Sequence, residues 1–183
     1  MTMMMVLVPF MMLAIYASRY KRVPPNMAMV VFGRRTTASD RGFTIVTGGG
    51  RFVRPIIEDI AWLSLKAHTV EMTIEAIRTD VRHGGPRITV EGIAVAAISS
   101  NPESLDLAAV HLLAKDDAEI ERIARLTAES LLRTYCASLT AETIREDREA
   151  LATRVREAAA KEVGKLGMEF PTYLIKEIRL AAT

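Results

Sequence analysis

The chain has 183 residues, of which 50% are hydrophobic and 25% are charged, as is typical of a folded protein rather than a disordered one. Its formal net charge is only +2, and no block of Lys and Arg with interleaved aromatic residues occurs, so nucleic acid is not expected as a partner. The single cysteine, Cys136, excludes an internal disulfide and any site built from several cysteine ligands.

The first 17 residues carry no charged side chain, and Arg19, Lys21 and Arg22 follow almost directly. As a helix, this run would be about 25 Å long, slightly less than the roughly 30 Å hydrocarbon core of a bilayer. We expect it to insert into a membrane. It can cross once, if the bilayer thins or Ser18 to Tyr20 join the helix, or it can form a kinked or re-entrant segment at Pro9. The residues expected to form the anchor are Val6, Leu7, Val8, Phe10, Met11, Met12, Leu13, Ile15 and Tyr16.

Two other interpretations of this run fit less well. A cleaved signal peptide carries its positive side chains before the apolar run, and here they follow it. A buried core helix is amphipathic, and this run is apolar on every side. We therefore assign residues 1–22 to a cell-membrane anchor with a basic flank, and the basic flank predicts that the rest of the chain is cytoplasmic.

The next part of the chain is rich in short β-type runs. Pro24-Pro25-Asn26 ends any helix that leaves the membrane, because proline disfavours helix in the residue before it. The alternation in His68 to Ile77 predicts a half-buried strand, and Arg87 to Ile98 turns apolar on both faces, as a central strand would. A turn at Arg82 to Pro86 predicts that these two strands form a hairpin. The shorter predicted strands are Met27 to Phe32, Thr44 to Thr47, Arg51 to Val53 and Ile60 to Leu65.

From Asn101 the periodicity becomes helical. Asn101, Asp116 and Thr140 are predicted helix caps. The helix that follows Asp116 is expected to bury Ile120, Ile123, Ala124, Thr127, Leu131 and Tyr135. A further helix, with or without a break, runs to Gly164, and Met168 to Leu180 returns as a strand. The sequence thus predicts an α+β fold, with a β-rich half at about 23–98 and a helical half at about 101–183.

We find no pattern that predicts a catalytic, cofactor or metal site. His68, His83 and His111 are far apart and lack second ligands at metal spacing. Cys136 has no histidine nearby in the sequence to activate it and is expected to be a small buried hydrophobe. The acids and bases of Glu142 to Glu162 alternate in sign, which favours a solvated helix face over paired catalytic carboxylates.

Several segments resemble the SPFH family of stomatins, prohibitins and flotillins, in order and over most of the chain. They are Val23-Pro-Pro-Asn-Met-Ala-Met-Val-Val-Phe-Gly, Ile88-Thr-Val-Glu-Gly-Ile-Ala-Val-Ala-Ala-Ile, Ala137-Ser-Leu-Thr-Ala-Glu-Thr-Ile-Arg-Glu-Asp-Arg-Glu, Val155-Arg-Glu-Ala-Ala and Val163-Gly-Lys-Leu-Gly-Met-Glu-Phe. The first of these, with the segment around Leu113, is similar to flotillins, and bacterial flotillin-like proteins fit best. The resemblance assigns residues 23–183 to an SPFH domain.

The resemblance implies a non-enzymatic scaffold without cofactors, which forms homo-oligomers through the SPFH domain and organises lipid microdomains and membrane proteins. A regulator or cage for a membrane protease is the alternative that other branches suggest, and a membrane-tethered enzyme using acids among Glu142 to Glu162 is a third. Flotillins continue into a long coiled coil, whereas this sequence stops at Thr183. We therefore expect a longer natural chain, and weak association of this part alone.

Overall fold

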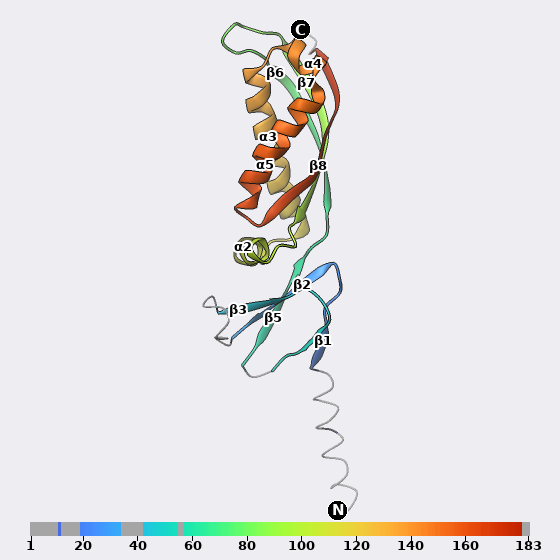
Figure 1. The fold of residues 1–183 in the computed structure, drawn as a ribbon, viewed down its shortest axis with the longest axis vertical. Coiled ribbons are helices and arrows are strands. Elements are labelled where there is room, and N and C mark those ends of the chain that lie inside the picture. The colour runs from blue at the N-terminus through green and yellow to red at the C-terminus, as the bar shows by residue number, and fades with distance from the viewer. Residues whose placement is uncertain (1–10, 12–18, 34–41, 55–56, 181–183) are drawn as a thin grey trace, which may run out of the picture. The chain divides into compact units, whose positions relative to one another are not determined.

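A computed structural model describes residues 11, 19–33, 42–54 and 57–180 of the chain. It divides the chain into two compact units, Met1–Leu65 and Lys66–Thr183. Figure 1 shows strands in the first unit, and in the second a long antiparallel sheet covered by helices. Strands and helices occur in comparable amounts, and the predicted α+β class is confirmed.

The first unit contains two small antiparallel sheets. One is a two-stranded ribbon of β1 and β4, and the other is a three-stranded sheet in the order β3-β2-β5. The strands are β1 (Tyr20–Arg22), β2 (Met27–Phe32), β3 (Phe43–Val46), β4 (Gly50–Phe52) and β5 (Asp59–Ser64).

A compact apolar cluster joins the two small sheets. Val23 directly follows β1 and Val53 directly follows β4, and both are buried against Met29 and Val31 of β2. Val46 and Ile60, on the two neighbouring strands, pack against the same cluster. Because both ends of the ribbon lead into buried valines, hydrophobic packing fixes the ribbon on the three-stranded sheet.

The second unit is a three-stranded antiparallel sheet with helices on one face. Its strand order is β6-β7-β8, so that β7 is the central strand. Helix α3 packs against β6, α5 packs against β8, and the two helices pack against each other (Figure 1). The elements are β6 (His68–Arg78), β7 (Arg87–Ile98), α2 (Pro102–Leu112), α3 (Asp117–Ser138), α4 (Ala141–Glu146), α5 (Arg148–Gly164) and β8 (Met168–Leu180).

The predicted helix starts and the hairpin are confirmed. The side chains of Asn101, Asp116 and Thr140 each accept a hydrogen bond from a backbone N–H in the first turn of their helices. β6 and β7 pair as the predicted hairpin, and the residues of β7 alternate between buried and half-buried, as a central strand requires. Strands β6 and β7 belong to the same compact unit as the helices.

Two local predictions are wrong, and one open alternative is decided. Tyr20 does not extend a helix, because it starts strand β1. The charged stretch of Glu142 to Glu162, expected as a helix with or without a break, has the break, because Asp147 leaves the helical conformation and caps α5. The buried face of α3 agrees with the predicted one only at Ile120 and Ala124. Ile123, Thr127, Leu131 and Tyr135 are only half-buried, and the other buried residues are Ala128, Leu132 and Cys136. The buried face includes the small residues Ala124, Ala128 and Cys136, which let the helix lie close to its neighbours.

The predicted anchor lies outside the described residues, except for Met11, and stays a prediction. Within the described ranges, no helix is both long enough and apolar enough to cross a membrane.

The turn between α5 and β8 depends on Gly167. Its φ is +81°, and a Cβ added there would collide with the backbone carbonyl of Ser104 and lie 2.6 Å from the backbone nitrogen of Ala108, both in α2. The turn therefore approaches the α2 backbone as closely as only glycine allows.

We predict that Gly167→Ala lowers the free energy of unfolding by about 3 kcal/mol, because backbone on both sides of the contact must shift. Gly164→Ala is the matched control, since a Cβ at Gly164 meets nothing within 4 Å. It should leave stability unchanged or raise it by about 0.5 kcal/mol. Urea unfolding of the two variants checks this, and equal destabilisation would contradict the role of the α2 contact.

Candidate functional site

The strongest candidate for a functional surface is the β1–β4 ribbon, which begins where the predicted anchor ends. Tyr20 pairs with Phe52, Lys21 with Arg51, and Arg22 with Gly50. The backbone ladder continues at both ends, since Val53 N–H donates to the Arg19 carbonyl (3.2 Å) and Val23 N–H to the Gly49 carbonyl (2.9 Å). Residues 19–22, predicted as a juxtamembrane flank, are therefore part of a folded element.

The ribbon brings five basic residues together and neutralises one of them. Lys21 and Arg51 are directly opposite each other, and the repulsion between their like charges destabilises the strand pair. Glu58 relieves it: its carboxylate lies 3.3 Å from Arg51 Nη2 and accepts a hydrogen bond from the Arg54 backbone N–H (3.0 Å). The Glu58 side chain is only 6% exposed, so Arg51 is held inward as its partner.

Four basic side chains on or beside the ribbon stay exposed: Arg19, Lys21, Arg22 and Arg54. None of them has an ion-pair partner among the residues that the structure describes. Sequence analysis found the first three from their position after the apolar run. It missed Arg54 and the inward role of Arg51, because only the pairing of β1 with β4 brings residues 51–54 beside residues 19–22.

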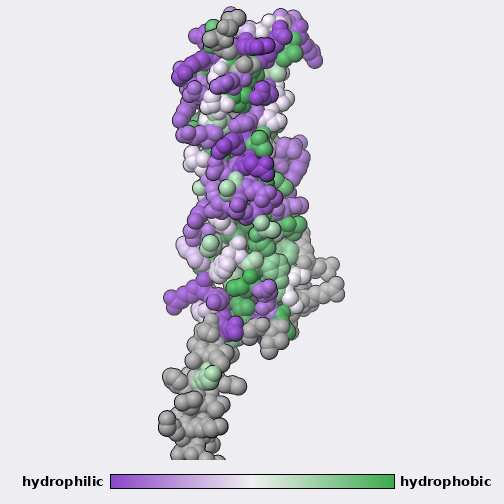
Figure 2. All heavy atoms as spheres, turned by 180° about the vertical axis from the view of Figure 1, so that it is seen from behind, coloured by the Kyte–Doolittle hydropathy of each residue, from purple (hydrophilic) through white to green (hydrophobic). Residues whose placement is uncertain are grey.

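Exposed apolar side chains lie in the same unit. Tyr20 is 52% exposed, Ile57 49% and Trp62 37%. The Tyr20 ring lies over Gly50, where an added Cβ would collide with it, so the glycine makes room for the aromatic side chain on the ribbon. On the face shown in Figure 2, hydrophobic atoms gather over the first unit, and hydrophilic atoms cover most of the second.

Charge is divided unequally between the two units. The first holds eight Lys and Arg residues against three Asp and Glu residues, a net charge of +5. The second holds sixteen against nineteen, a net charge of −3. The near-neutral total of +2 conceals this division, which sequence analysis did not find because it summed over the whole chain.

Comparison with known proteins supplies the family. A model of the "SPFH domain / Band 7 family" matches residues 21–183. The chain belongs to this family. The predicted resemblance is confirmed, and the match covers both units described above.

Flotillins are among the similar proteins, as predicted. Flotillin-1 of Homo sapiens is 36% identical over 155 residues, which are 84% of this chain and 35% of that protein. Flotillin-2a of Danio rerio is 33% identical over 156 residues, 85% of this chain and 35% of the relative. Flotillin-like protein FloT of Bacillus subtilis (strain 168) is 28% identical over 175 residues, 92% of this chain and 34% of the relative. This SPFH chain thus spans about a third of the length of these relatives.

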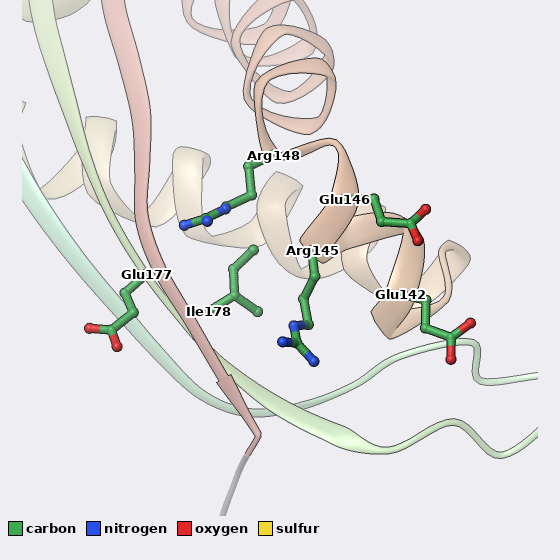
Figure 3. A pocket seen from close by; sticks show the side chains of 6 residues that line it. All are labelled: Glu142, Arg145, Glu146, Arg148, Glu177 and Ile178. Carbon is green, nitrogen blue, oxygen red and sulfur yellow. The ribbon is translucent and has the colours of Figure 1, made fainter.

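A polar hollow of about 530 Å³ lies where α4, α5 and β8 of the SPFH domain meet. Figure 3 shows Arg145 and Arg148 beside Ile178, while Glu142 and Glu146 point away from Arg148. Glu177 lies on the other side of β8 and forms an ion pair with Arg179, and this hydrogen bond lowers the pKa of Glu177. The acids around this hollow do not converge, so they supply no carboxylate pair for acid-base chemistry.

The other residues considered in the sequence stay apart. His68 is half-buried on β6, His111 is exposed on α2, and His83 forms a hydrogen bond with the Asp80 carboxylate (2.8 Å) in the β6–β7 turn. In the described part of the SPFH chain, no three His, Cys, Asp or Glu residues are grouped so as to hold a metal ion.

Cys136 is fully buried on the sheet-facing side of α3, as its predicted role requires. Burial raises the pKa of its thiol from 9.0 to about 11, because the low-dielectric interior disfavours the thiolate. Burial also raises the pKa of Tyr173, whose Oη has no hydrogen-bond partner among the described residues. A protonated, enclosed thiol is a poor nucleophile at neutral pH.

We predict that the Cys136 thiol makes stability fall with rising pH. Between pH 9 and about pH 11 the unfolded thiol loses its proton while the folded one keeps it. Unfolding then releases a proton, and the folded state loses about 2–3 kcal/mol over this interval. Measured by urea unfolding, the stability of Cys136→Ala relative to the unmodified chain should rise by this amount from pH 8.5 to 11. A constant difference would contradict the burial effect.

Proposed function

We propose that this chain is the membrane-proximal part of a non-enzymatic scaffold, which assembles on a membrane and organises the lipids and proteins around it. Family membership and the similarity to flotillins support this proposal. The observation that carries it is the position of the ribbon. The uncharged run ends at Ala17, and a paired strand with basic side chains begins at Tyr20.

This spacing leaves only Ser18 and Arg19 between the anchor and the folded first unit. Two residues reach at most about 7 Å, so an inserted anchor would hold the first unit at the headgroup region rather than on a long tether. The basic flank favours the cytoplasmic side of the membrane for both units.

Assembly follows from the same anchoring. Copies that are held at one surface meet at a high effective concentration, so weak side-to-side contacts become sufficient. Head-to-tail contacts between identical copies of the chain close into rings when the rotation from one copy to the next permits it. The exposed ion pairs of α3 and α5, such as Glu121–Arg125 and Glu162–Lys165, show that both charge signs are available on the helical surface. Such pairs contribute only about 0–1 kcal/mol each, so assembly should depend on the membrane.

We predict that removing the anchor releases the protein from membranes. Deletion of residues 1–18 leaves strand β1 intact and should move most of the chain into the soluble fraction after a carbonate wash. In solution the deleted chain should be a monomer or a small oligomer, because its side-to-side contacts are weak when no membrane holds the copies together. Membrane flotation and light scattering measure the two effects.

A full-length control separates the loss of the anchor from the loss of residues. Replacing Leu7, Met11 and Leu13 by Asn buries three amides in hydrocarbon, at a cost of about 2 kcal/mol or more each, and should release the chain as the deletion does. Replacing the same three residues by Ile should not. If the deleted and Asn-substituted chains both remain in carbonate-washed membranes, the anchoring proposal fails.

A further inference from the structure

We propose that the first unit binds anionic phospholipid headgroups through Arg19, Lys21, Arg22 and Arg54, and that this contact fixes which unit faces the bilayer. The inference rests on the proposed membrane location, but it concerns a second attachment, which is electrostatic and independent of the apolar run. It assigns a ligand class, negatively charged lipid, to the exposed side chains of the β1–β4 ribbon.

The first support is geometric. Arg19 directly precedes β1, Lys21 and Arg22 lie on it, and Arg54 follows Val53, whose N–H donates to the Arg19 carbonyl. Their side chains are exposed, and in the described residues none is paired with an acid. Unpaired cations along a short ribbon form a spread surface, which suits many headgroups better than a single anion.

The second support is that the nearby acid neutralises none of these four side chains. Glu58 is the buried partner of Arg51 and of the Arg54 backbone N–H, so it neutralises the inward guanidinium and not the outward ones. The only other acid in the described part of the first unit is Asp59, whose carboxylate accepts a hydrogen bond from the Ile60 backbone N–H (2.8 Å). The ribbon therefore keeps four net positive side chains toward solvent.

The third support is the division of charge between the units. An anionic membrane surface attracts the first unit, with net charge +5, and repels the second, with net charge −3. Each basic residue close to such a surface strengthens binding by about fivefold, and the attraction falls off within a Debye length. A chain whose basic unit adjoins the anchor would gain orientation as well as affinity.

The chemistry near the ribbon favours lipid over a nucleic acid or a free phosphate. The cations begin two residues after an uncharged run of 17 residues. Tyr20, 52% exposed within the ribbon, has the amphipathic side chain that is enriched at the headgroup level of membranes. The four cations do not converge on an enclosed space, which a site for one phosphate ion would require.

The test separates this contact from the anchor. In the full-length chain with Leu7, Met11 and Leu13 replaced by Asn, we expect binding to vesicles of mixed phosphatidylcholine and phosphatidylglycerol, and none to vesicles of phosphatidylcholine alone. Changing Arg19, Lys21, Arg22 and Arg54 together to Gln should weaken binding to the mixed vesicles by roughly several hundredfold, since each contributes about fivefold. Raising the salt concentration should weaken it further.

The matched control removes the same charge from the second unit. Arg122, Arg133, Arg154 and Arg156 are exposed and have no ion-pair partner in the described residues, and their joint change to Gln should leave vesicle binding within about twofold. Equal loss in both quadruple variants, or equal binding to neutral and anionic vesicles, would overturn the inference. Tighter binding to a short DNA duplex, or competition by inorganic phosphate at constant ionic strength, would also overturn it.

The two proposals can fail separately. If the unmodified full-length chain does not insert into phosphatidylcholine vesicles, the anchor proposal fails, while salt-sensitive binding to anionic vesicles can still be measured. If the unmodified chain inserts equally well into both kinds of vesicle and the ribbon variant behaves like the control, only the headgroup inference fails.

Discussion

The pairing of Tyr20–Arg22 with Gly50–Phe52 is the interaction on which the proposed role depends. It converts the residues directly after the apolar run from a flexible flank into a strand, and the buried Val23 and Val53 then fix that strand on the three-stranded sheet. Under the proposed anchoring, a membrane segment that ends at Ala17 would be joined to this folded unit by only two residues. The basic side chains of the ribbon therefore have a defined arrangement, which they would lack in a disordered tail.

The second unit differs from the first in charge and in the cover of its sheet. Its sheet is covered by α3 and α5, whose exposed surfaces carry acidic and basic side chains in ion pairs. The net charge of this unit is negative. Gly167 closely approaches the α2 backbone and Cys136 is buried on α3, and in the described residues no three His, Cys, Asp or Glu side chains are grouped so as to hold a metal ion.

The sequence predicted most of the second unit, because its patterns are local. Alternation in β6 and β7, the turn between them and three helix caps depend on residues within one element. The prediction of the buried face of α3 was wrong at Ile123, Thr127, Leu131 and Tyr135. The helix packs through a face that includes the small residues Ala124, Ala128 and Cys136, and side-chain size alone does not indicate that face. The candidate site was only half predictable: Arg54 joins Arg19 through a long-range strand pairing, and the pairing of Glu58 with Arg51 has no signal in the sequence.

The most direct test measures where each unit lies relative to the bilayer. Cys136 is buried, so a fluorophore can be attached to a single introduced cysteine, Ile57→Cys in the first unit or Thr153→Cys on α5. In full-length protein reconstituted into anionic vesicles that contain lipids with brominated headgroup-proximal chains, our account predicts strong quenching of the label at position 57 and none at position 153. Equal quenching at the two positions, or quenching at position 153 alone, would contradict it.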